Sequence, residues 1–519
     1  MSMNSGARAR MSTSDPEPRA RRARAPVSRL TLGAHGGDSA AMRALTNPVS
    51  YLDGVYAPVA DEIEADDLPI VGELPPEIAG VFVQNNPNPR FPPGGAYHWF
   101  DGDGMVHGVY LRDGRASYRN RYVRTLGLAR DEAAGQPLTR GILEPFDPAR
   151  SAEADKNTAN TDLVWHGGRL MALWWLGGQP YELSVPDLAT LGTVDFGGTL
   201  DCGVAAHPKV DPVTGELIFF DYDVYAAPHL RYGVLSADGR VTHRADIELP
   251  GPRLLHDIAI TERYTVFLDL PMTWDTERLR HGKRRVRFDA DAPTRFGVLP
   301  RHGGADAIRW FEAPACYVYH TVNAYEAVNA AGHAEIVLTA CRIDNPVPTV
   351  PHAEEPLIPR LYFLRLHPFF YRWRIDLQTG AVTGEPLDDV PTEFPRMDPR
   401  RLGRRSRYSY HPRVAPGPTL LFDGVIKYDA DAGGSEAHTW GDGCVGGETV
   451  FVPRDGGEAE DDGYVMTYVT DRRADTSELV VLDARAVANG PIARVRLPRR
   501  VPFGFHAHWA PHASQEGRT

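Results

Sequence analysis

Four histidines stand in sequence contexts that could hold a metal ion. The chain has 19 histidines, and a lone histidine is more often an ordinary core or surface residue than a ligand. Four of them lie in or beside an apolar run typical of a β-strand: His207 (GVAAHPKVD), His256 (LLHDIAIT), His320 (VYHTVNAYE) and His506 (VPFGFHAHWAP). They are 49, 64 and 186 residues apart. This spacing differs from that of a zinc finger or a helical H-E-x-x-H site and suits ligands donated by successive sheets to one axis.

Cysteine contributes no comparable site. The four cysteines, Cys202, Cys316, Cys341 and Cys444, are dispersed and form no C-x-x-C pair, so neither a disulfide framework nor a cysteine zinc site is expected. We therefore predict a protein of the reducing cytoplasm. No apolar run approaches the roughly 20 residues that cross a bilayer, and the N-terminus lacks the hydrophobic core of a signal peptide.

The elements that must position the histidines are predicted to be strands. A strand, a short polar turn and a second strand recur in four segments: 181–196, 231–247, 371–387 and 477–497. Residues 109–125 and 207–223 have similar hairpin chemistry, with Asp and Gly in the turns. Repeated hairpins with few long amphipathic helices predict an all-β propeller, with two β-sandwich domains as the alternative. Most of the 50 Gly and 44 Pro then belong to turns within one domain, residues 47–515.

Three stretches interrupt the strand pattern. Residues 126–150 are predicted to be partly helical, residues 278–288 (RLRHGKRRVRF) are basic, and residues 361–373 (LYFLRLHPFFYRW) are rich in leucine and aromatics. Such insertions could cover one end of a propeller, line a substrate tunnel or make peripheral contact with a membrane. A solvated loop for the basic stretch and a buried strand for the aromatic stretch are alternatives as well supported as membrane contact.

Charge separates the N-terminus from the rest of the chain. Residues 1–46 hold eight Arg and no Lys against Asp15, Glu17 and Asp38, a net charge of +5. The whole chain carries −12, so the remaining residues carry −17. We expect residues 1–46 to be a disordered basic arm. A solvated leader is a simpler interpretation of this arm than a functional anchor. The acidic remainder is a poor match for nucleic acid, so no nucleic-acid partner is expected.

Nine ordered motifs between Gly80 and Trp509 carry a family resemblance. They are VFVQNNPNPRF, YHWFDGDGMVHGVYLRDGRASYRNRYVRT, NTANTDLVWHGGRLMALW, AAHPKVDPVTGELIFFDYD, LLHDIAIT, YHTVNAYE, EFPRMDP, GGETVFVPR and FGFHAHW. In these motifs the sequence resembles the carotenoid cleavage oxygenases, a family that includes the retinal-pigment-epithelium isomerase and the lignostilbene dioxygenases.

The resemblance implies a seven-bladed β-propeller, with loop and helical insertions forming a dome over a metal on its axis. It also implies Fe(II) held by His207, His256, His320 and His506. Four neutral imidazoles leave the 2+ charge uncompensated, and an octahedral ion keeps two positions open.

Metal-binding histidines need a partner on their second ring nitrogen, and the family supplies glutamates to three of the four. By resemblance, Glu393 (EFPRMDP) partners His320 and Glu448 (GGETVFVPR) partners His506. The third glutamate is missing: where relatives read A-L-W-E, this chain reads Ala172-Leu173-Trp174-Trp175, followed by an apparent one-residue insertion. Trp175 thus stands where the partner of His256 is expected and cannot accept that hydrogen bond. Glu182 could substitute, although an ordinary strand-end carboxylate is favoured.

The implied reaction is oxidative cleavage of a conjugated C=C bond by O2 into two carbonyl products. Thr161 aligns with a residue that in some relatives faces the open coordination position, where it could disfavour solvent; an ordinary strand threonine is an equal alternative. Candidate contacts to a hydrophobic polyene or stilbene are Phe91, Trp174, Trp175, Phe363, Phe369 and Phe370, each of which is more often simple core.

Two differences from the lignostilbene-type relatives favour a carotenoid-type substrate. Lignostilbene-type relatives carry a lysine where Trp174 stands and a tyrosine upstream, where this chain reads ILEPF. A carotenoid or apocarotenoid is therefore preferred over a stilbene. A propeller that binds or isomerises an isoprenoid without cleaving it remains an alternative, because of the lost glutamate.

Overall fold

The structure is a computed structural model that describes residues 51–146, 155–185, 187–284, 286–346, 366–417 and 419–511. The chain divides into two units, Met1–Thr46 and Asn47–Thr519, and every described residue belongs to the second. The predicted basic arm, residues 1–46, lies outside the described residues.

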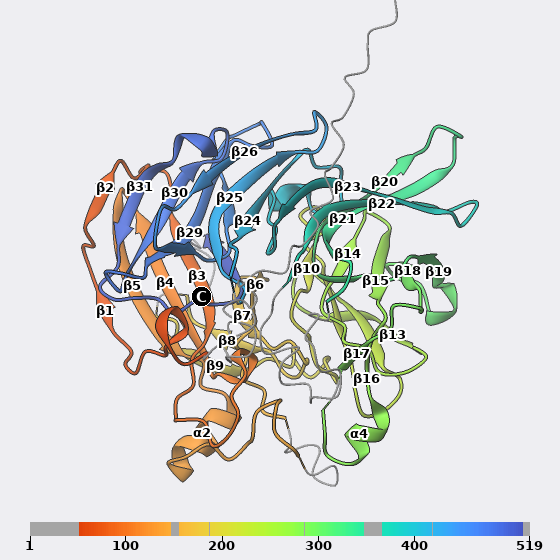
Figure 1. Cartoon of the computed structure of the whole chain (residues 1–519), viewed down its shortest axis with the longest axis horizontal. Coiled ribbons are helices and arrows are strands. Elements are labelled where there is room, and N and C mark those ends of the chain that lie inside the picture. Colours follow the sequence, from red (N-terminus) through yellow and green to blue (C-terminus); the bar gives the residue numbers. More distant parts are fainter. Residues whose placement is uncertain are drawn as a thin grey trace, which may run out of the picture. The chain divides into compact units, whose positions relative to one another are not determined.

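Antiparallel sheets follow one another around a ring in this second unit (Figure 1). The first sheet contains β1 (Glu64–Ala65), β3 (Gly80–Pro87), β4 (Gly104–Arg112), β5 (Arg115–Tyr122) and β32 (Ala507–Pro511). The second contains β6 (Asp162–His166), β7 (Arg169–Leu173), β8 (Tyr181–Leu183) and β9 (Thr190–Thr193). The third contains β10 (Lys209–Val210), β11 (Leu217–Asp221), β12 (Leu230–Leu235) and β13 (Val241–Ile247).

The ring continues with two more four-stranded sheets. The fourth contains β14 (Ile258–Ile260), β15 (Tyr264–Asp269), β18 (Thr294–Pro300) and β19 (Arg309–Ala313). The fifth contains β20 (Tyr317–Val328), β21 (Ala334–Ile343), β22 (Phe369–Asp376) and β23 (Val382–Pro391).

The remaining two blades are joined into one nine-stranded sheet by a single pairing of Phe422 with Gly446. The sixth blade contains β24 (Tyr408–Val414), β25 (Phe422–Asp429) and β26 (Gly434–Thr439). The seventh contains β27 (Cys444–Gly446), β28 (Val450–Pro453), β29 (Gly463–Asp471), β30 (Thr476–Asp483), β31 (Pro491–Arg496) and β2 (Ile70–Gly72). The prediction of an all-β seven-bladed propeller is confirmed.

Strands from the two ends of the chain close the ring. In the first blade β3 pairs with β32, so that Val83 lies opposite His508. In the seventh blade β2 pairs with β31, so that Ile70 lies opposite Val495. These pairings place strands from both ends of the chain in the first and seventh blades and so tie the ring together.

The predicted hairpins follow from local sequence. All six predicted segments form antiparallel pairs, including β4–β5, where Arg112 lies opposite Arg115. The two residues between them are Asp113 and Gly114, both with positive φ, 51° and 70°. That is the backbone conformation of the two-residue turn that Asp-Gly favours. Along β5, exposed or half-exposed residues alternate with Ala116, Tyr118 and Asn120, which are buried, because successive side chains of a strand point to opposite faces.

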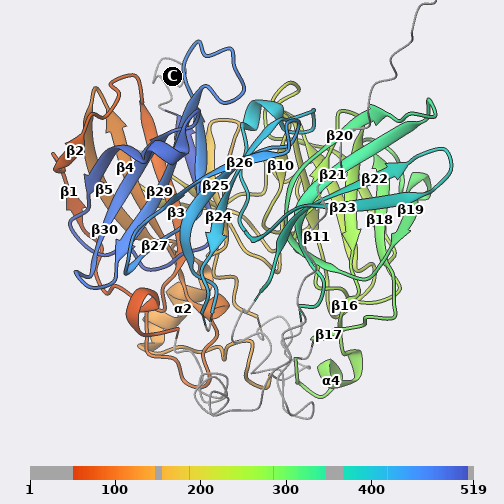
Figure 2. The same cartoon turned by 45° about the horizontal axis from the view of Figure 1, so that its top comes forward.

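Short helices and an extra hairpin gather at one end of the blades (Figure 2). Helix α2 (Leu126–Ala134) begins after Thr125, whose hydroxyl accepts a hydrogen bond from Leu128 N, and ends at Gly135 in the left-handed conformation. Helix α4 (Thr276–Arg280) lies between the strands of the hairpin β16 (Met272–Trp274) and β17 (Val286–Phe288). The predicted partly helical stretch is thus confirmed over its described part. No described helix is long and apolar enough to span a membrane.

Candidate metal centre

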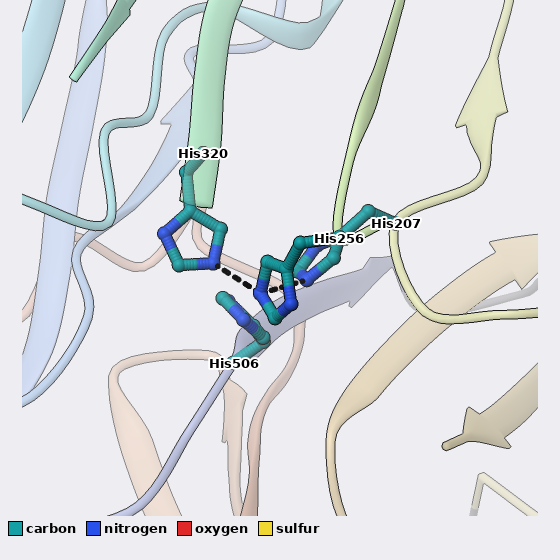
Figure 3. A group of neighbouring side chains, drawn as sticks. All are labelled: His207, His256, His320 and His506. Atoms are coloured by element: carbon teal, nitrogen blue, oxygen red, sulfur yellow. Dashed lines mark hydrogen bonds between the residues drawn. The ribbon is translucent and has the colours of Figure 1, made fainter. Parts of the chain in front are cut away.

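The four predicted histidines meet at the inner edges of four blades. His207 and His256 lie two residues before β10 and β14, His320 lies on β20, and His506 immediately precedes β32. Their rings point toward one another (Figure 3). The Nε2 atoms of His207 and His256 are 3.2 Å apart, as are those of His256 and His320, and one ring nitrogen from each of the four lies within 4.8 Å of the others. Blades far apart in sequence thereby bring four imidazoles to one point.

His207 has an unusual backbone conformation. Its φ is +68°, in the left-handed region that non-glycine residues rarely adopt. The Asp162 carboxylate accepts a hydrogen bond from His207 N at 3.0 Å, and its Oδ2 lies 3.8 Å from His207 Nδ1. Strained backbone of this kind persists where surrounding contacts hold it, and Asp162, at the start of β6 in the neighbouring blade, supplies one.

Two buried glutamates orient two of the rings. Glu393 Oε2 lies 2.5 Å from His320 Nδ1, and Glu448 Oε1 lies 3.0 Å from His506 Nδ1. A carboxylate on Nδ1 keeps the proton there and leaves the lone pair of Nε2 available to a metal. Glu448 is further held by Arg396, which donates from Nε and Nη2 to its two oxygens at 2.9 Å each.

The other two rings are held neutral by their surroundings. Burial, with a smaller contribution from neighbouring histidines, lowers the pKa values of both His207 and His256 well below the ordinary range. Neutral imidazole is the form that binds metal. Ring nitrogens at this spacing need to move by only a few tenths of an ångström to bind one ion at bond lengths of about 2 Å. The donor set therefore fits a resident metal ion.

A narrow apolar cavity opens onto the histidines, with about 30 Å³ of room for water-sized molecules, and we call it the metal cavity. Its wall includes His256, His320, His506 and Thr161, and otherwise consists mainly of apolar and aromatic side chains: Trp99, Phe100, Trp175, Tyr319, Leu366, Phe394, Leu420 and Phe505. A space lined in this way receives an apolar molecule and keeps bulk water from the metal.

Comparison with known proteins shows which family the chain belongs to. Residues 56–511 match the family model described as retinal pigment epithelial membrane protein. The carotenoid 9,10(9′,10′)-cleavage dioxygenase of Crocus sativus is 37% identical over 506 residues, covering 89% of each chain. The chain belongs to the carotenoid cleavage oxygenase family. The carotenoid cleavage oxygenase of Mycobacterium tuberculosis is 35% identical over 515 residues, covering 89% of this chain and 97% of the relative.

Solved structures of family members have a similar fold. The lignostilbene dioxygenase of Pseudomonas brassicacearum superposes with a TM-score of 0.80 at 34% identity, over 90% of this chain and 99% of that chain. A cobalt-substituted form of the Synechocystis apocarotenoid oxygenase superposes with a TM-score of 0.75 at 29% identity, over 88% of this chain and 97% of that one. The predicted family, and with it the prediction of an oxidoreductase of the dioxygenase type, are confirmed.

His256 differs from its two glutamate-bound neighbours within this family site. In the described part of the chain no carboxylate is hydrogen-bonded to its ring. Trp175 lines the metal cavity beside it and stacks on Trp274, with ring centroids 6.5 Å apart. Glu182, the conceivable substitute, instead pairs with Arg169 at 3.1 Å. His256 is therefore positioned by packing, including an edge contact with Tyr319 at 5.0 Å between centroids.

The predicted substrate contacts divide between two spaces. Trp175 lines the metal cavity, whereas Phe91 and Trp174 line a neighbouring pocket. Phe369 and Phe370 lie on β22 and line neither space among the described residues; Phe370 packs in a separate core cluster. The sixth candidate, Phe363, lies outside the described residues.

Thr161 lines the metal cavity with its hydroxyl already engaged. The hydroxyl donates to Asn160 Oδ1 at 2.9 Å and accepts from Trp175 N at 3.1 Å. Its main-chain oxygen accepts from His506 N at 3.2 Å. With both hydroxyl contacts made inside the protein, the methyl group is what the side chain can offer to the cavity.

Several residues of the site were not predicted from the sequence. Tyr319, Phe394 and Phe505 each adjoin a predicted ligand or glutamate in sequence, and that adjacency was the available signal. Asp162 and Arg396 carried no such signal, because their roles depend on contacts with residues 45 and 52 positions away.

Proposed function

We propose that this chain is an Fe(II)-dependent dioxygenase that cleaves a conjugated C=C bond of a carotenoid or apocarotenoid. The alkene C=C bond and the O–O bond break, and two C=O bonds form, so one O2 supplies both oxygen atoms. No proton enters or leaves, and the reaction needs no general acid or nucleophile.

One observation carries this proposal: four imidazole nitrogens converge at the wall of an otherwise apolar, aromatic cavity. An all-histidine set without a carboxylate ligand leaves the charge of a divalent ion uncompensated, and imidazole suits iron as well as zinc, copper and nickel. Iron is preferred among these because the proposed reaction activates dioxygen. Bound iron would supply the redox chemistry that activates dioxygen.

The protein's own residues have three tasks. The pair Glu393 and Glu448 keeps the Nδ1 protons of two rings in place and so aims their Nε2 atoms inward. Aromatic walls exclude water and hold a flat conjugated chain by dispersion and stacking. Thr161, whose hydroxyl bonds are satisfied internally, presents an apolar group that disfavours solvent near the reacting bond.

Stilbene cleavage is the second candidate, and the similarity to a lignostilbene dioxygenase favours it. A phenolic substrate calls for a polar or cationic partner inside the cavity. The described residues that line the metal cavity include no lysine or arginine, and Trp174 stands at the position where such relatives carry lysine. A polyene is therefore preferred.

The test is a direct assay. The protein is purified with Fe(II) and incubated aerobically with β-apo-8′-carotenal, with a full-length carotenoid and with resveratrol, and products are separated by chromatography. We expect aldehydes from a polyene, with both oxygens labelled under ¹⁸O2. Absence of product from all three at stoichiometric iron would overturn the dioxygenase proposal in favour of a binding or isomerising protein.

Cytoplasmic location and peripheral membrane contact stay predictions. The support for contact is the basic stretch around α4, where Arg280 and Lys283 are exposed. Co-sedimentation with anionic liposomes, compared with neutral ones, would test it.

A further inference from the structure

One buried aspartate, Asp257, connects three of the four chain segments that carry the histidines. Its side chain is only 2% exposed. Its Oδ1 accepts a hydrogen bond from Lys209 Nζ at 2.6 Å, and its Oδ2 accepts from the main-chain N and the hydroxyl of Thr321 at 2.7 and 2.8 Å. Lys209 lies on β10, two residues after His207, and Thr321 follows His320 on β20. A single carboxylate therefore joins the third, fourth and fifth blades next to the metal site.

The histidine that most needs such a connection is His256, which directly precedes Asp257. Its Nε2 lies 3.2 Å from that of His207 and 3.2 Å from that of His320 (Figure 3). Among the described residues no carboxylate is hydrogen-bonded to its ring, whereas a glutamate contacts His320 Nδ1. Asp257 Oδ1 also accepts from Ile258 N at 2.7 Å, at the start of β14. The main chain directly after His256 is thus fixed even though its ring has no carboxylate partner.

The four contacts of Asp257 require a carboxylate. The Lys209 ammonium, the Thr321 N–H and hydroxyl, and the Ile258 N–H all donate to it. An ionised carboxylate only accepts, on both of its oxygens. An asparagine has one oxygen and one NH2 group, so in either orientation it would direct N–H donors at other donors. Replacement by asparagine should therefore break the connection to at least one neighbouring blade.

We propose that Asp257 is a positioning residue of the metal centre, which holds the main chain of His256 where a carboxylate on the ring is lacking and couples it to the segments of His207 and His320. This inference rests on the metal site of the function proposed above, but not on the cleavage reaction. Ligand distances in metal sites stay within about 0.2 Å of their preferred values. A small displacement of the His256 main chain is therefore enough to change both metal affinity and coordination geometry.

The test loads the metal-free full chain with Co(II), whose visible absorption bands report the geometry of its ligands. The dissociation constant is measured by competition with a chelator. For Asp257→Asn we expect binding to weaken roughly tenfold or more, as when a group that orients a metal ligand is removed, together with altered bands. Thr321→Val removes one hydrogen bond and keeps the main-chain N–H, so it should change both quantities less but in the same direction. This milder variant decides the question if Asp257→Asn does not fold.

Lys209→Met distinguishes positioning from a simple effect of charge. Asp257→Asn removes a negative charge near the metal, and Lys209→Met removes a positive one. Coulomb attraction alone would therefore weaken Co(II) binding in the first variant and strengthen it in the second. Positioning predicts weaker binding in both, because each variant loses a contact between Asp257 and a neighbouring blade. Tighter binding by Lys209→Met with unchanged absorption bands would overturn the proposal.

Asp131→Asn is the matched control. The Asp131 side chain is 3% exposed, and it too accepts from a lysine, Lys156, at 2.6 Å and from a main-chain N–H, that of Leu138, at 2.9 Å. None of these three residues lines the metal cavity. We expect this variant to be less stable but to bind Co(II) with unchanged affinity and bands. An equal loss of Co(II) affinity in Asp131→Asn would show general destabilisation and overturn the positioning role.

The outcomes separate this inference from the proposed function. If Asp257→Asn keeps the wild-type affinity and bands while the iron-loaded wild type cleaves a polyene, only the positioning role is overturned. If the Co(II) affinities follow the expected order but the iron-loaded wild type cleaves no substrate, the dioxygenase function fails and the positioning role stands. A wild-type protein that binds no Co(II) would overturn both.

Discussion

Replacing Arg396 should weaken both the fold and the metal site, although Arg396 contacts no predicted ligand side chain. Its guanidinium binds both oxygens of Glu448 and also the main-chain oxygen of Ala507 at 3.0 Å. Arg396→Met keeps most of the aliphatic stem and removes the cation. Glu448 is then left buried, with His506 Nδ1 and Ala507 N as its remaining partners.

The size of the effect follows from the state of that carboxylate. Burial alone would raise the pKa of Glu448, but the attraction of Arg396 and then of His506 outweighs it and lowers the pKa from 4.5 to about 2. This lowering of the pKa corresponds to about 3 kcal/mol of preferential stabilisation of the ionised form. The Glu448 side chain is 2% exposed but that of Arg396 is 32% exposed, so water can replace part of the lost interaction. We therefore expect Arg396→Met to cost about 2–3 kcal/mol of unfolding free energy, somewhat less than the roughly 3–5 kcal/mol of breaking a fully buried pair.

A double-mutant cycle measures the pair itself. Urea unfolding of metal-free protein, followed by tryptophan fluorescence after reversibility is established, compares Arg396→Met, Glu448→Gln and the double variant. We expect the double variant to lose less than the sum of the single losses, with a coupling of about 2 kcal/mol, because it contains no unpaired buried charge. Iron affinity of Arg396→Met should fall roughly tenfold through the loosened His506.

The surface pair of Arg372 and Glu385 provides the control. Arg372 Nη2 lies 2.7 Å from Glu385, whose side chain is 54% exposed, and Arg372→Met should cost less than about 1 kcal/mol. A loss below about 1 kcal/mol for Arg396→Met, or strict additivity in the cycle, would refute the reasoning.

Three further changes have defined outcomes. His320→Ala should abolish iron retention measured by metal analysis, whereas His302→Ala, at an exposed position, should retain stoichiometric iron; full iron in the first variant would show that the ligand set is wrong. Asp101, with its pKa raised to about 6, favours the folded state at low pH and loses that contribution as pH rises from about 4 to about 6, by up to about 3 kcal/mol. The unfolding free energy of Asp101→Asn should lack this decline, and an unchanged pH slope would contradict the assignment. Thr161→Ser keeps both hydroxyl contacts but removes the methyl group, so iron content should stay unchanged while the cleavage rate falls; an unchanged rate would remove Thr161 from the reaction.

Much of the architecture is local and could be predicted from the sequence. Asp113-Gly114 adopts the turn that its residue types favour, and six hairpins formed where strand and turn chemistry alternated. Local chemistry cannot set the number of blades, however, because closure depends on pairings such as Val83 with His508, which join opposite ends of the chain.

The metal site also has features that the sequence determines and features that depend on the tertiary structure. By itself, the sequence determined which residue types were available: four histidines in strand contexts, two glutamates in matching motifs and a tryptophan where a third glutamate was expected. Only the tertiary structure decided that ring nitrogens from four blades converge within 4.8 Å, that Arg396 holds Glu448, and that Trp174 and Trp175 line different spaces. The physical reason is that hydrogen bonding, burial and charge pairing act through space over a few ångströms, whereas these partners are separated by up to hundreds of residues along the chain.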